Sequence, residues 1–506
     1  MSQLLAAIHI HAKAEPKHVA IQGSREKELI SYAELSVYIE YISCFLNELG
    51  ASRVAIWMDN TPAVLMVDLA CVQNKLLTVP VPLFFTPQQI SHSLHQAGID
   101  TLVSGMGDAQ TQGLLKGLGV VYDKLSDLTL GDECLNVYRL ATKGESIALP
   151  ADEIQKVTYT SGSTGDPKGV CLTQKSIETV VLSLLKATEA QAADRHLCLL
   201  PYATLLENIA GMYVLLMVGG RVCLPGLANV GMQGATGLGI SRFISALHDY
   251  SATTCIMIPQ MLQALLTGID GGAKKPACLR FIAVGGAPVS DVLIQRSAQL
   301  DLPVFEGYGL SESASVVALN TAQYHQTGSV GRVLPHMEVR IADDGEIYLK
   351  ETLFSGYLSD GKVPVEAEYA TGDIGHLDDN GFLYIEGRKK HIFITSFGRN
   401  VSPEWVEKEL SIEAAIAQIC VFGEAQPFNV AVIVMDDGFE VKKDIAKAVE
   451  KANLRLPDYA QVHRWIIAHE PFCIANGQWT GTGRPRRLVI YQAYQALLDA
   501  LYKEKI

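Results

Sequence analysis

The sequence lacks the cysteine patterns of metal-binding and disulfide-rich proteins. Its 10 cysteines stand singly along 506 residues, without a C-x-x-C motif or a His/Cys ligand spacing. Zinc-finger and disulfide scaffolds need such spacings, so both classes are excluded. We expect the cysteines to be reduced core residues of a cytosolic protein.

Long apolar runs are also missing, and so is an excess of positive charge. No run approaches the ~18 consecutive apolar residues of a membrane span, and the N-terminal segment has no basic region, while His9 and His11 interrupt its apolar residues. The chain holds 41 Lys and Arg against 54 Asp and Glu, a net charge of −13. These absences predict a soluble, cytoplasmic protein with no integral membrane segment, no signal peptide and no nucleic-acid partner.

The composition is that of a well-packed globular enzyme, with 48% hydrophobic and 19% charged residues. A chain of 506 residues exceeds one ordinary core, so two or more domains are expected. Helical and strand patterns alternate from the helix predicted at Tyr32–Leu49 to the strand predicted at Phe281–Val284, which is the rhythm of a parallel sheet layered by helices. After Gly328 shorter strands predict a small β unit, and beyond Lys390 the patterns predict a compact α+β unit.

The segment Tyr159-Thr-Ser-Gly-Ser-Thr-Gly-Asp-Pro-Lys-Gly169 carries the strongest chemical signal. Its glycines let the backbone approach a ligand, its hydroxyl groups are donors, and Lys168 adds a positive charge, a combination that suits a polyphosphate. The spacing differs from the usual nucleotide P-loop, because Lys168 lies three residues after Gly165. A strand at Ile154–Tyr159 and a helix at Ser176–Ala187 would place the loop where α/β sheets bind phosphates; a plain surface turn is the alternative.

This loop resembles the phosphate-binding signature of the adenylate-forming superfamily, which includes acyl-CoA synthetases, aryl-CoA ligases, luciferases and peptide-synthetase adenylation domains. Three further matches follow in the family's order. Residues 306–313, Glu-Gly-Tyr-Gly-Leu-Ser-Glu-Ser, resemble its second nucleotide motif, and residues 369–373, Tyr-Ala-Thr-Gly-Asp, resemble its ribose motif. Residues 387–390 and 398–404 resemble its interdomain hinge and the loop beyond it. Four motifs in order leave little room for chance.

The resemblance implies an α/β fold with a large N-terminal domain of helix-layered β-sheets and a small β unit, plus a small mobile α+β C-terminal domain. Residues 1–387 would form the large ATP- and acyl-binding domain, residues 388–390 the hinge with Lys390, and residues 391–506 the lid. It also implies the reaction, in which a carboxylate attacks the α-phosphate of ATP to give an acyl-adenylate and pyrophosphate.

The residue types at the matched positions suit that reaction. Lys168 would neutralise phosphate charge, while Thr164 and Glu312 would lie near Mg²⁺. Asp373 could accept hydrogen bonds from the ribose hydroxyls, with Arg388 as a further donor. Nucleotide contacts are expected from Thr160, Ser161, Gly162, Ser163, Thr164, Gly165, Gly286, Ala287, Glu306, Gly307, Tyr308, Gly309, Ser311, Asp373 and Arg388. An exposed glutamate, a surface turn and ordinary packing are the respective alternatives for Glu312, Asp373 and Tyr308.

One position departs from the family pattern. Residues 476–487 match the segment that carries the lysine of the adenylation step, and this chain has Arg484 there. A guanidinium is planar and binds phosphate or carboxylate as a fork, whereas an ammonium acts as a point charge. Either Arg484 is a third catalytic residue beside Lys168 and Glu312, bridging the carboxylate and the α-phosphate, or adenylation is weakened; we favour the first because the other motifs are intact.

The acid and the acyl acceptor are less closely defined. Residues 200–207 resemble the Pro-Leu-x-His-x-x-Glu stretch of acyl-CoA synthetases, with Thr204 in place of the histidine, and Leu206–Leu216 either lines an acyl tunnel or packs as a plain helix. Residues near Thr395 and Phe472 are most similar to long-chain acyl-CoA synthetases. A fatty or similarly apolar carboxylate is therefore predicted, with ATP, Mg²⁺ and CoA. An acyl-AMP ligase that loads a carrier protein and an inactive homologue remain alternatives.

Overall fold

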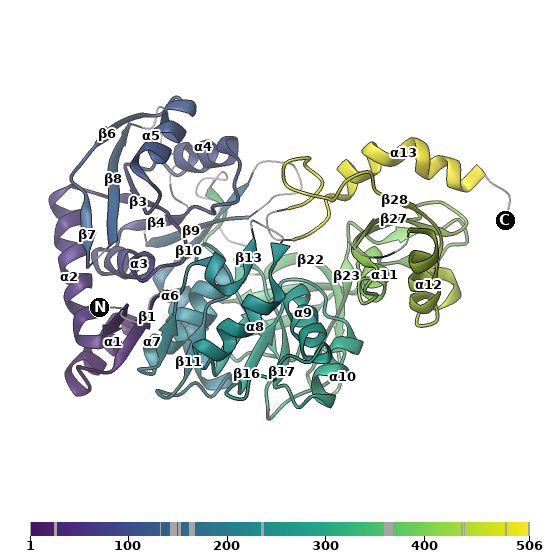
Figure 1. The fold of residues 1–506 in the computed structure, drawn as a ribbon, viewed down its shortest axis with the longest axis horizontal. Coiled ribbons are helices and arrows are strands. Elements are labelled where there is room, and N and C mark those ends of the chain that lie inside the picture. Colours follow the sequence, from purple (N-terminus) through teal and green to yellow (C-terminus); the bar gives the residue numbers. More distant parts are fainter. Residues whose placement is uncertain are drawn as a thin grey trace.

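The structure of the chain is a computed structural model that describes residues 2–24, 28–131, 133–141, 149, 153–160, 167–233, 237–358, 368–436, 439, 441–480 and 483–503. Figure 1 shows a large body that contains the N-terminus and a smaller body at the C-terminal end. Among the described residues, no helix combines the length and the apolar character that crossing a bilayer would require.

The first sheet of the large body has eight strands. β10, β9, β4, β3, β5, β8 and β6 follow one another in this order, and β7 pairs with β8. The bounds are β3 Arg53–Trp57, β4 Leu77–Pro80, β5 Thr101–Ser104, β6 Val121–Lys124, β7 Leu128–Leu130, β8 Glu133–Ala141, β9 Ile154–Thr160 and β10 Lys168–Thr173. β3, β4 and β5 are parallel, as the alternation of helices and strands predicts, but β8 and β10 run antiparallel to their neighbours, so the sheet as a whole is mixed.

The second sheet has nine strands in the order β19, β18, β17, β16, β15, β11, β12, β1 and β2. Its centre from β17 to β1 is parallel. The bounds are β1 Val19–Gln22, β2 Leu29–Ser31, β11 Arg195–Leu197, β12 Arg221–Cys223, β15 Thr254–Met257, β16 Phe281–Val284, β17 Val304–Tyr308, β18 Ala318–Leu319 and β19 Arg332–Val333. A separate short pair is formed by β13 Met232–Gln233 and β14 Gly237–Leu238.

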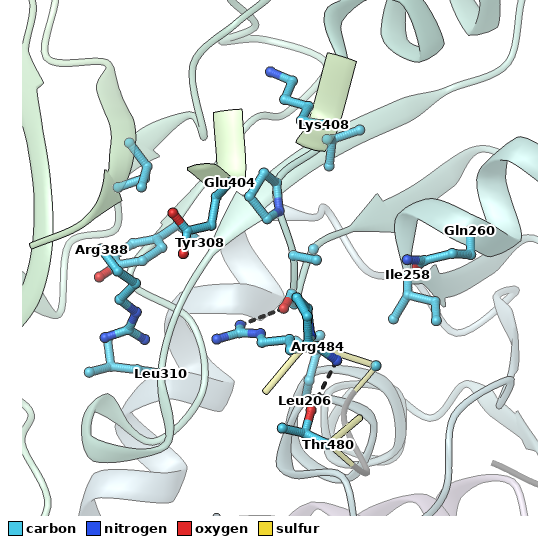
Figure 2. A pocket seen from close by; sticks show the side chains of 18 of the residues that line it. Leu206, Ile258, Gln260, Tyr308, Leu310, Arg388, Glu404, Lys408, Thr480 and Arg484 are labelled. Carbon is cyan, nitrogen blue, oxygen red and sulfur yellow. Dashed lines mark hydrogen bonds between the residues drawn. The ribbon is translucent and has the colours of Figure 1, made fainter. Parts of the chain in front are cut away.

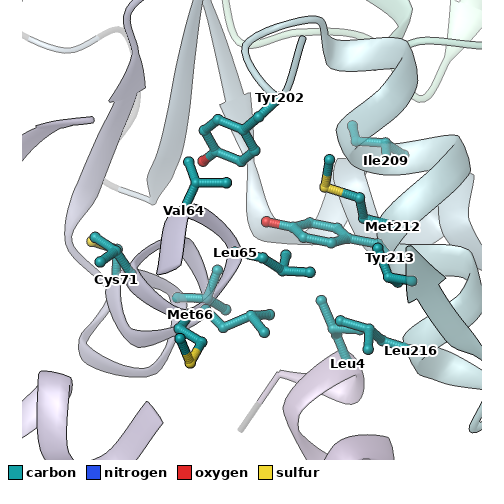
Figure 3. Packing of buried hydrophobic residues seen from close by; sticks show 14 of the residues in the cluster. Leu4, Val64, Leu65, Met66, Cys71, Tyr202, Ile209, Met212, Tyr213 and Leu216 are labelled. Atoms are coloured by element: carbon teal, nitrogen blue, oxygen red, sulfur yellow. The ribbon is translucent and has the colours of Figure 1, made fainter. Parts of the chain in front are cut away.

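Helices fill the space around and between the two sheets. Their bounds are α1 Gln3–Ala14, α2 Tyr32–Glu48, α3 Pro62–Asn74, α4 Pro87–Gln96, α5 Asp108–Gly117, α6 Gln174–Ala187, η1 Glu207–Tyr213, α7 Val214–Met217, η2 Leu227–Val230, α8 Ile240–Asp249, α9 Pro259–Asp270, α10 Asp291–Gln299 and η3 Ser311–Ser313. The main core joins residues of both sheets to α1, α2, α3, α6 and η1. Figure 3 shows Leu4, Met66 and Tyr213 from three of these helices meeting in it.

Two smaller units follow. An antiparallel sheet is formed by β20 Met337–Ile341, β21 Glu346–Glu351, β22 Glu368–Leu377 and β23 Leu383–Arg388, as the shorter strand patterns predict. The C-terminal unit has a sheet of β26 Ile416–Phe422, β27 Asn429–Met435 and β28 Val462–Ile467, a β24 Phe393–Ile394 and β25 Asn400–Val401 pair, and helices α11 Pro403–Leu410, α12 Val441–Asn453 and α13 Arg487–Lys503 with the single turn η5 Asp458–Ala460.

The fold class is thus confirmed, with three local corrections. The helix expected within Leu205–Val218 is a π-helix, η1, continued by α7. α1, α5, α10 and α13 were not predicted from the sequence, although Ile490, Tyr494 and Leu498 give α13 a buried stripe at helical spacing. Cys44, Cys134 and Cys278 are exposed, on the outer side of α2, on β8 and in a loop, so the expectation of core cysteines was wrong for these three.

Candidate nucleotide and acyl site

A cavity of ≈ 2910 Å³ lies between the large body and the C-terminal unit and continues into the large body. It brings together side chains from β9, β10, β17, η3, β22, β23 and the segment before α13. In Figure 2, Tyr308 and Arg388 from the large body lie on one side of the cavity, and Arg484 from the C-terminal unit reaches across it. Segments that the sequence separates by more than 300 residues therefore form one site.

The loop after β9 is held at both ends by a β ladder. Thr160 pairs in register with Lys168, and both residues line the cavity. The expected strand and helix are confirmed as β9 and α6. Because β10 lies between the loop and α6 and is antiparallel to β9, the loop joins the two strands of a hairpin. Five of the expected phosphate-binding residues lie outside the described residues: Ser161, Gly162, Ser163, Thr164 and Gly165.

Lys168 and Glu312 are linked by one aromatic side chain. The Nζ atom of Lys168 lies 5.0 Å from the ring centroid of Tyr357, and the hydroxyl of Tyr357 donates a hydrogen bond of 2.7 Å to Oε1 of Glu312. The Tyr369 hydroxyl lies 3.0 Å from that of Tyr357. Phe354 packs edge-on against both tyrosine rings. The ring of Tyr357 thus contacts the cation of Lys168, and its hydroxyl group contacts the carboxylate of Glu312.

Asp373 on β22 is buried and has a partner on each oxygen. Nε of Arg388 lies 2.8 Å from Oδ1, and the hydroxyl of Tyr308 donates to Oδ2 at 2.6 Å. Burial raises the pKa of the Asp373 carboxyl above its ordinary value, while Arg388 and Tyr308 act to lower it. Each carboxylate oxygen has a second lone pair, so both can accept one more hydrogen bond from a ligand.

The glycine-containing segments 285–287 and 307–309 have backbone packed too closely for a side chain at Gly285 and Gly309. A Cβ atom on Gly285 would lie 2.9 Å from the carbonyl oxygen of Gly307, and one on Gly309 would lie 1.6 Å from that of Ser315. Gly286 has a φ of +80°, which glycine adopts without strain. Gly286, Ala287 and Gly307 line the cavity, as do Gly309 and Ser311. The two motifs therefore form one continuous wall.

Glu306 lines the cavity beside this wall and is largely buried. Its Oε1 accepts a long hydrogen bond of 3.4 Å from the amide of Val289. Burial raises the pKa of Glu306 to about 8, although the charge of Lys408 on α11 and the Val289 amide act in the opposite direction. At neutral pH this carboxyl group is therefore substantially protonated.

Arg484 crosses from the C-terminal unit to the large body. Its Nη2 donates a hydrogen bond of 2.5 Å to the carbonyl oxygen of Gly286, and its own amide is held by the Thr480 hydroxyl at 2.9 Å. Both bonds are visible in Figure 2. The guanidinium lies among groups that include Asp373 and Arg388, whose charges act on it. Of the other basic residues in this segment, Arg487 pairs with Glu407 and Glu404 inside the C-terminal unit, so it is part of that unit's own packing.

The expected hinge lies at the end of β23. Lys389 forms ion pairs with Asp344 at 2.7 Å and Glu346 at 2.6 Å, which tie it to the large body. Lys390 is exposed, and desolvation together with the charges of Arg388 and Lys168 lowers its pKa. His391, the next residue, bonds Glu404 of the C-terminal unit at 2.5 Å. The change of partner from one body to the other occurs at Lys390.

Inside the large body the cavity has an apolar section. One wall comes from alternate residues of two parallel strands, and the other from one face of the helix η1 and its continuation α7. The strand wall consists of Thr254, Ile256, Ile258, Phe281 and Ala283; the helix wall consists of Leu206, Ala210 and Val214. One face of the segment Leu206–Leu216 therefore lines the cavity, as the acyl-tunnel interpretation of this segment requires. Sequence patterns missed Tyr357, because a single tyrosine in the segment between β21 and β22 carries no chemical signal.

Comparisons with known proteins agree with this arrangement. The model of the AMP-binding enzyme family matches residues 8–358, and the model of the AMP-binding enzyme C-terminal domain matches residues 390–506. The long-chain-fatty-acid–CoA ligase FadD15 of Mycobacterium bovis is 26% identical over an alignment of 583 positions, which spans 99% of this chain and 97% of that protein. The 2-succinylbenzoate–CoA ligase of Listeria monocytogenes is 26% identical over 443 residues, which cover 85% of this chain and 88% of that protein.

Solved structures share the fold at lower identity. The anthranilate CoA ligase AuaEII, in complex with anthranoyl-AMP, aligns with a TM-score of 0.80 and 16% identity over 98% of both chains. The o-succinylbenzoate CoA synthetase MenE from Bacillus subtilis, in complex with ATP and a magnesium ion, aligns with a TM-score of 0.73 and 20% identity over 95% of this chain and 98% of that one.

Proposed function

Because the chain belongs to the AMP-binding enzyme family, we propose that it activates a fatty or similarly apolar carboxylic acid as an acyl-adenylate and transfers the acyl group to CoA. It is an adenylate-forming CoA ligase of that family, and the CoA ligases of the family use ATP, Mg²⁺ and CoA. The products are acyl-CoA, AMP and pyrophosphate. The apolar character of the acid is inferred from the cavity of this chain.

The apolar section of the cavity carries that proposal. It begins beside Gly285 and runs along β15 and β16, between Ile256 and Ala283 on one side and Ala210 on the other. Apolar walls favour a hydrocarbon chain or ring, because burial contributes roughly 25 cal/mol per Å² of apolar surface. The ligases named above, which act on long-chain and aromatic acids, agree with an acid of this kind, although their substrates differ from one another.

In this proposal the phosphates bind at the hairpin loop. Lys168 neutralises phosphate charge, Thr160 and the loop residues Ser161 to Gly165 supply donors, and Glu312 and Thr164 are the groups that would hold Mg²⁺. The fit is sound at Glu312, since its carboxylate is a hard oxygen ligand in the cavity and keeps lone pairs beyond the one that Tyr357 occupies. When bound, Mg²⁺ neutralises charge on the transferring phosphate.

The nucleoside would bind between the two glycine-rich segments and the ribose pair. Asp373 and Arg388 contact the ribose, the Tyr308 ring offers a face to the adenine, and the close-packed backbone at Gly286, Ala287, Gly307, Gly309 and Ser311 lines the purine. Glu306, which also lines the cavity, belongs to the same nucleotide-binding segment. The observation that favours these roles is that all these groups meet in one cavity although they come from separate strands.

Adenylation then proceeds by attack of a carboxylate oxygen of the acid on the α-phosphorus of ATP, with pyrophosphate as the leaving group. Arg484 is the group that would bridge the carboxylate and the α-phosphate, because its guanidinium reaches the Gly286 carbonyl at the junction of the nucleotide and acyl sections. Its planar fork can bind two oxygens at once. This favours a working variant over a weakened enzyme.

For the second step we propose that residues 391–506 rotate as a lid on residues 1–387 about residues 388–390, with Lys390 as the hinge. The Lys390 position between Lys389, paired with the large body, and His391, paired with the lid, supports this division. Rotation would withdraw Arg484 and admit the CoA thiol, which attacks the acyl carbonyl and releases AMP. The relatives named above are CoA ligases, so CoA is the acceptor proposed, in the cytoplasm.

The proposal is tested by incubating the purified protein with ATP, Mg²⁺, CoA and a panel of fatty, aromatic and amino acids, and following AMP and acyl-CoA by mass spectrometry. We expect AMP and acyl-CoA in equal amounts with apolar acids and none with amino acids. AMP formation without any thioester would contradict the CoA step, and turnover restricted to polar acids would contradict the apolar substrate.

A further inference from the structure

A chain of three buried polar side chains crosses the otherwise apolar section of the cavity. Nδ1 of His196 on β11 lies 3.0 Å from Oγ1 of Thr254 on β15, and Nε2 of His196 lies 2.7 Å from Oε1 of Glu207 in η1. Their exposed fractions are 2% for His196, 7% for Thr254 and 0% for Glu207. His196 and Thr254 line the cavity.

The contacts of Glu207 fix the direction of this chain. Its Oε2 accepts hydrogen bonds from the amides of Leu199 at 3.1 Å and Leu200 at 2.8 Å, so donors surround the carboxylate. An ionised carboxylate accepts and does not donate. Nε2 of His196 is therefore the donor to Glu207, and the ring orientation is set from outside the cavity.

The role of Nδ1 then decides what Thr254 presents to the cavity. If the imidazole is neutral, Nδ1 accepts the Thr254 hydroxyl hydrogen and the threonine oxygen keeps its lone pairs. If the imidazole is charged by its buried carboxylate partner, Nδ1 donates to Thr254 and the threonine hydroxyl hydrogen is free. A ligand hydroxyl group can donate or accept, so it matches Thr254 in either state.

The helix η1 leaves room for these three polar side chains because it has a glycine, Gly211, beside them. A Cβ atom on Gly211 would lie 2.4 Å from Nε2 of His196 and 2.5 Å from Oε1 of Glu207, so no larger residue fits there without moving the pair. Gly211 belongs to the π-helical turn η1, a geometry that is frequent at functional sites. Simple hydrophobic packing would not require a buried, hydrogen-bonded histidine and glutamate at this position.

The polar chain lies deep along the acyl section. His196, Thr254 and Phe281 are neighbours in register on three parallel strands, with Ala283 and then Gly285 further along β16 towards the nucleotide. Four residues of strand, from Phe281 to Gly285, span roughly 13 Å. A ligand group at Thr254 is therefore remote from the carboxylate that is activated at Gly286.

We propose that Thr254, oriented by His196 and Glu207, is a specificity site that binds a hydroxyl group on the remote part of the acyl substrate. The inference deepens the proposed function and rests on it. The substrate class it names is an apolar carboxylic acid with one oxygen substituent far from its carboxylate. Thr254 contacts the substrate, whereas His196 and Glu207 are positioning residues.

The test compares matched acids that differ by one hydroxyl group. Straight-chain acids of graded length and their ω-hydroxy counterparts are supplied to the wild type and to Thr254→Val, Thr254→Ser and Thr78→Val, and kcat/KM is measured for each. At the best length, we expect the wild type to prefer the hydroxy acid. Thr254→Val should lower the ratio of hydroxy to plain acid about five- to tenfold, the size of one buried hydrogen bond.

Two variants separate recognition from folding. Thr254→Ser keeps the hydroxyl group and should keep the preference, and Thr78→Val makes the same substitution at a buried threonine of β4 that does not line the cavity, so it should leave the ratio unchanged. An unchanged ratio in Thr254→Val, or equal use of both acids at every length by the wild type, overturns this inference alone. No AMP from any acid overturns the proposed function and this inference with it.

Discussion

The hydroxyl of Tyr357 donates a 2.7 Å hydrogen bond to Oε1 of Glu312, while the ring of the same tyrosine lies under Nζ of Lys168. One side chain thus orients the carboxylate proposed for Mg²⁺ and the cation proposed for the phosphates. Because the hydroxyl and the ring act on different partners, the two contacts can be separated by mutation.

Tyr357→Phe removes the hydrogen bond to Glu312 and keeps the ring under Lys168. We expect the Mg²⁺ concentration for half-maximal ATP–pyrophosphate exchange to rise about three- to tenfold, the effect of one hydrogen bond of ~1 kcal/mol. The rate at saturating Mg²⁺ should change little. Tyr348→Phe, which removes the same hydroxyl group from a tyrosine of β21 that does not line the cavity, is the matched control. An unaltered Mg²⁺ dependence in Tyr357→Phe would show that Glu312 does not hold the metal.

Lys168→Ala and Glu312→Ala should each lower pyrophosphate exchange by about 10²-fold, since each removes a preorganised charge at the reacting phosphates. Lys175→Ala provides the control, because this lysine on α6 is exposed and does not line the cavity. Circular dichroism checks that the variants are folded. Exchange at the wild-type rate in a folded variant would remove that residue from the site.

Asp373→Asn tests the ribose site without leaving a cavity. The amide retains the shape but loses one acceptor and the charge that pairs with Arg388, so the KM for ATP should rise about tenfold with kcat little changed, as expected for a uniform binding contact. The same assay with 2′-deoxy-ATP provides the sharper measurement. If Asp373 binds the ribose hydroxyls, the preference of the wild type for ATP over 2′-deoxy-ATP shrinks in the variant; an equal preference would move the ribose site elsewhere.

Much of this site was predictable, because many of its functional residues lie in short sequence motifs. Asp373 and Tyr308 each lie within such a motif, and the structure joins them by a hydrogen bond of 2.6 Å. The alternation of helices and strands likewise gives the α/β fold class. Strand direction was not predictable from the same pattern. Most residues of β9 and β10 are buried, which is compatible with either orientation, and only the ladder from Thr160 to Lys168 makes the two strands a hairpin.

Residues that act through tertiary contacts carried no local signal. His196 and Thr254 lie 58 positions apart and meet only because β11 and β15 are neighbours in register. Glu207 stands in a recognisable motif, yet its partner could not be named from the sequence. The π-helical turn around Gly211 depends on the crowding of that pair, and the apolar spacing of the segment indicates an ordinary helix equally well.

Glu306→Gln should change how stability depends on pH. The folded-state pKa of Glu306 is about 8 because of burial, above the ordinary value of 4.5, so the native state binds more protons than the unfolded state between these values. The contribution of Glu306 to the free energy of unfolding of the wild type therefore falls as the pH rises from about 4.5 to 8, and it is constant at higher pH. The variant lacks this loss, and its advantage at high pH should reach a few kcal/mol, since one pKa unit equals ~1.4 kcal/mol.

Thermal unfolding at a series of pH values measures this effect. The difference in midpoint between Glu306→Gln and the wild type should be smallest near pH 5 and largest above pH 8. Glu450→Gln, at an exposed glutamate of α12, should show no such trend. A constant difference across the range would mean that Glu306 is ionised in the folded protein and that the Lys408 charge outweighs burial.

Arg484 gives the sharpest test of the two-step reaction, because its contact with the Gly286 carbonyl exists only while the C-terminal unit lies against the large body in this way. Arg484→Ala should suppress acyl-adenylate formation about 10²-fold and leave the conversion of supplied acyl-AMP to acyl-CoA largely intact, since the proposed rotation removes residue 484 from the second step. Arg486→Ala, two positions along the same segment, should affect neither step.

Arg484→Lys then asks whether position and charge suffice. Near-normal adenylation would show that a point charge performs the task, whereas a large loss would show a site shaped for the planar fork of arginine. The fork predicts the loss, because it can hold the Gly286 carbonyl and a phosphate oxygen at once while a lysine ammonium at the same backbone position is a single compact charge. A wild type without pyrophosphate exchange, together with exchange in Arg484→Lys, would contradict the working-variant interpretation and identify arginine at this position as the cause of a lost first step.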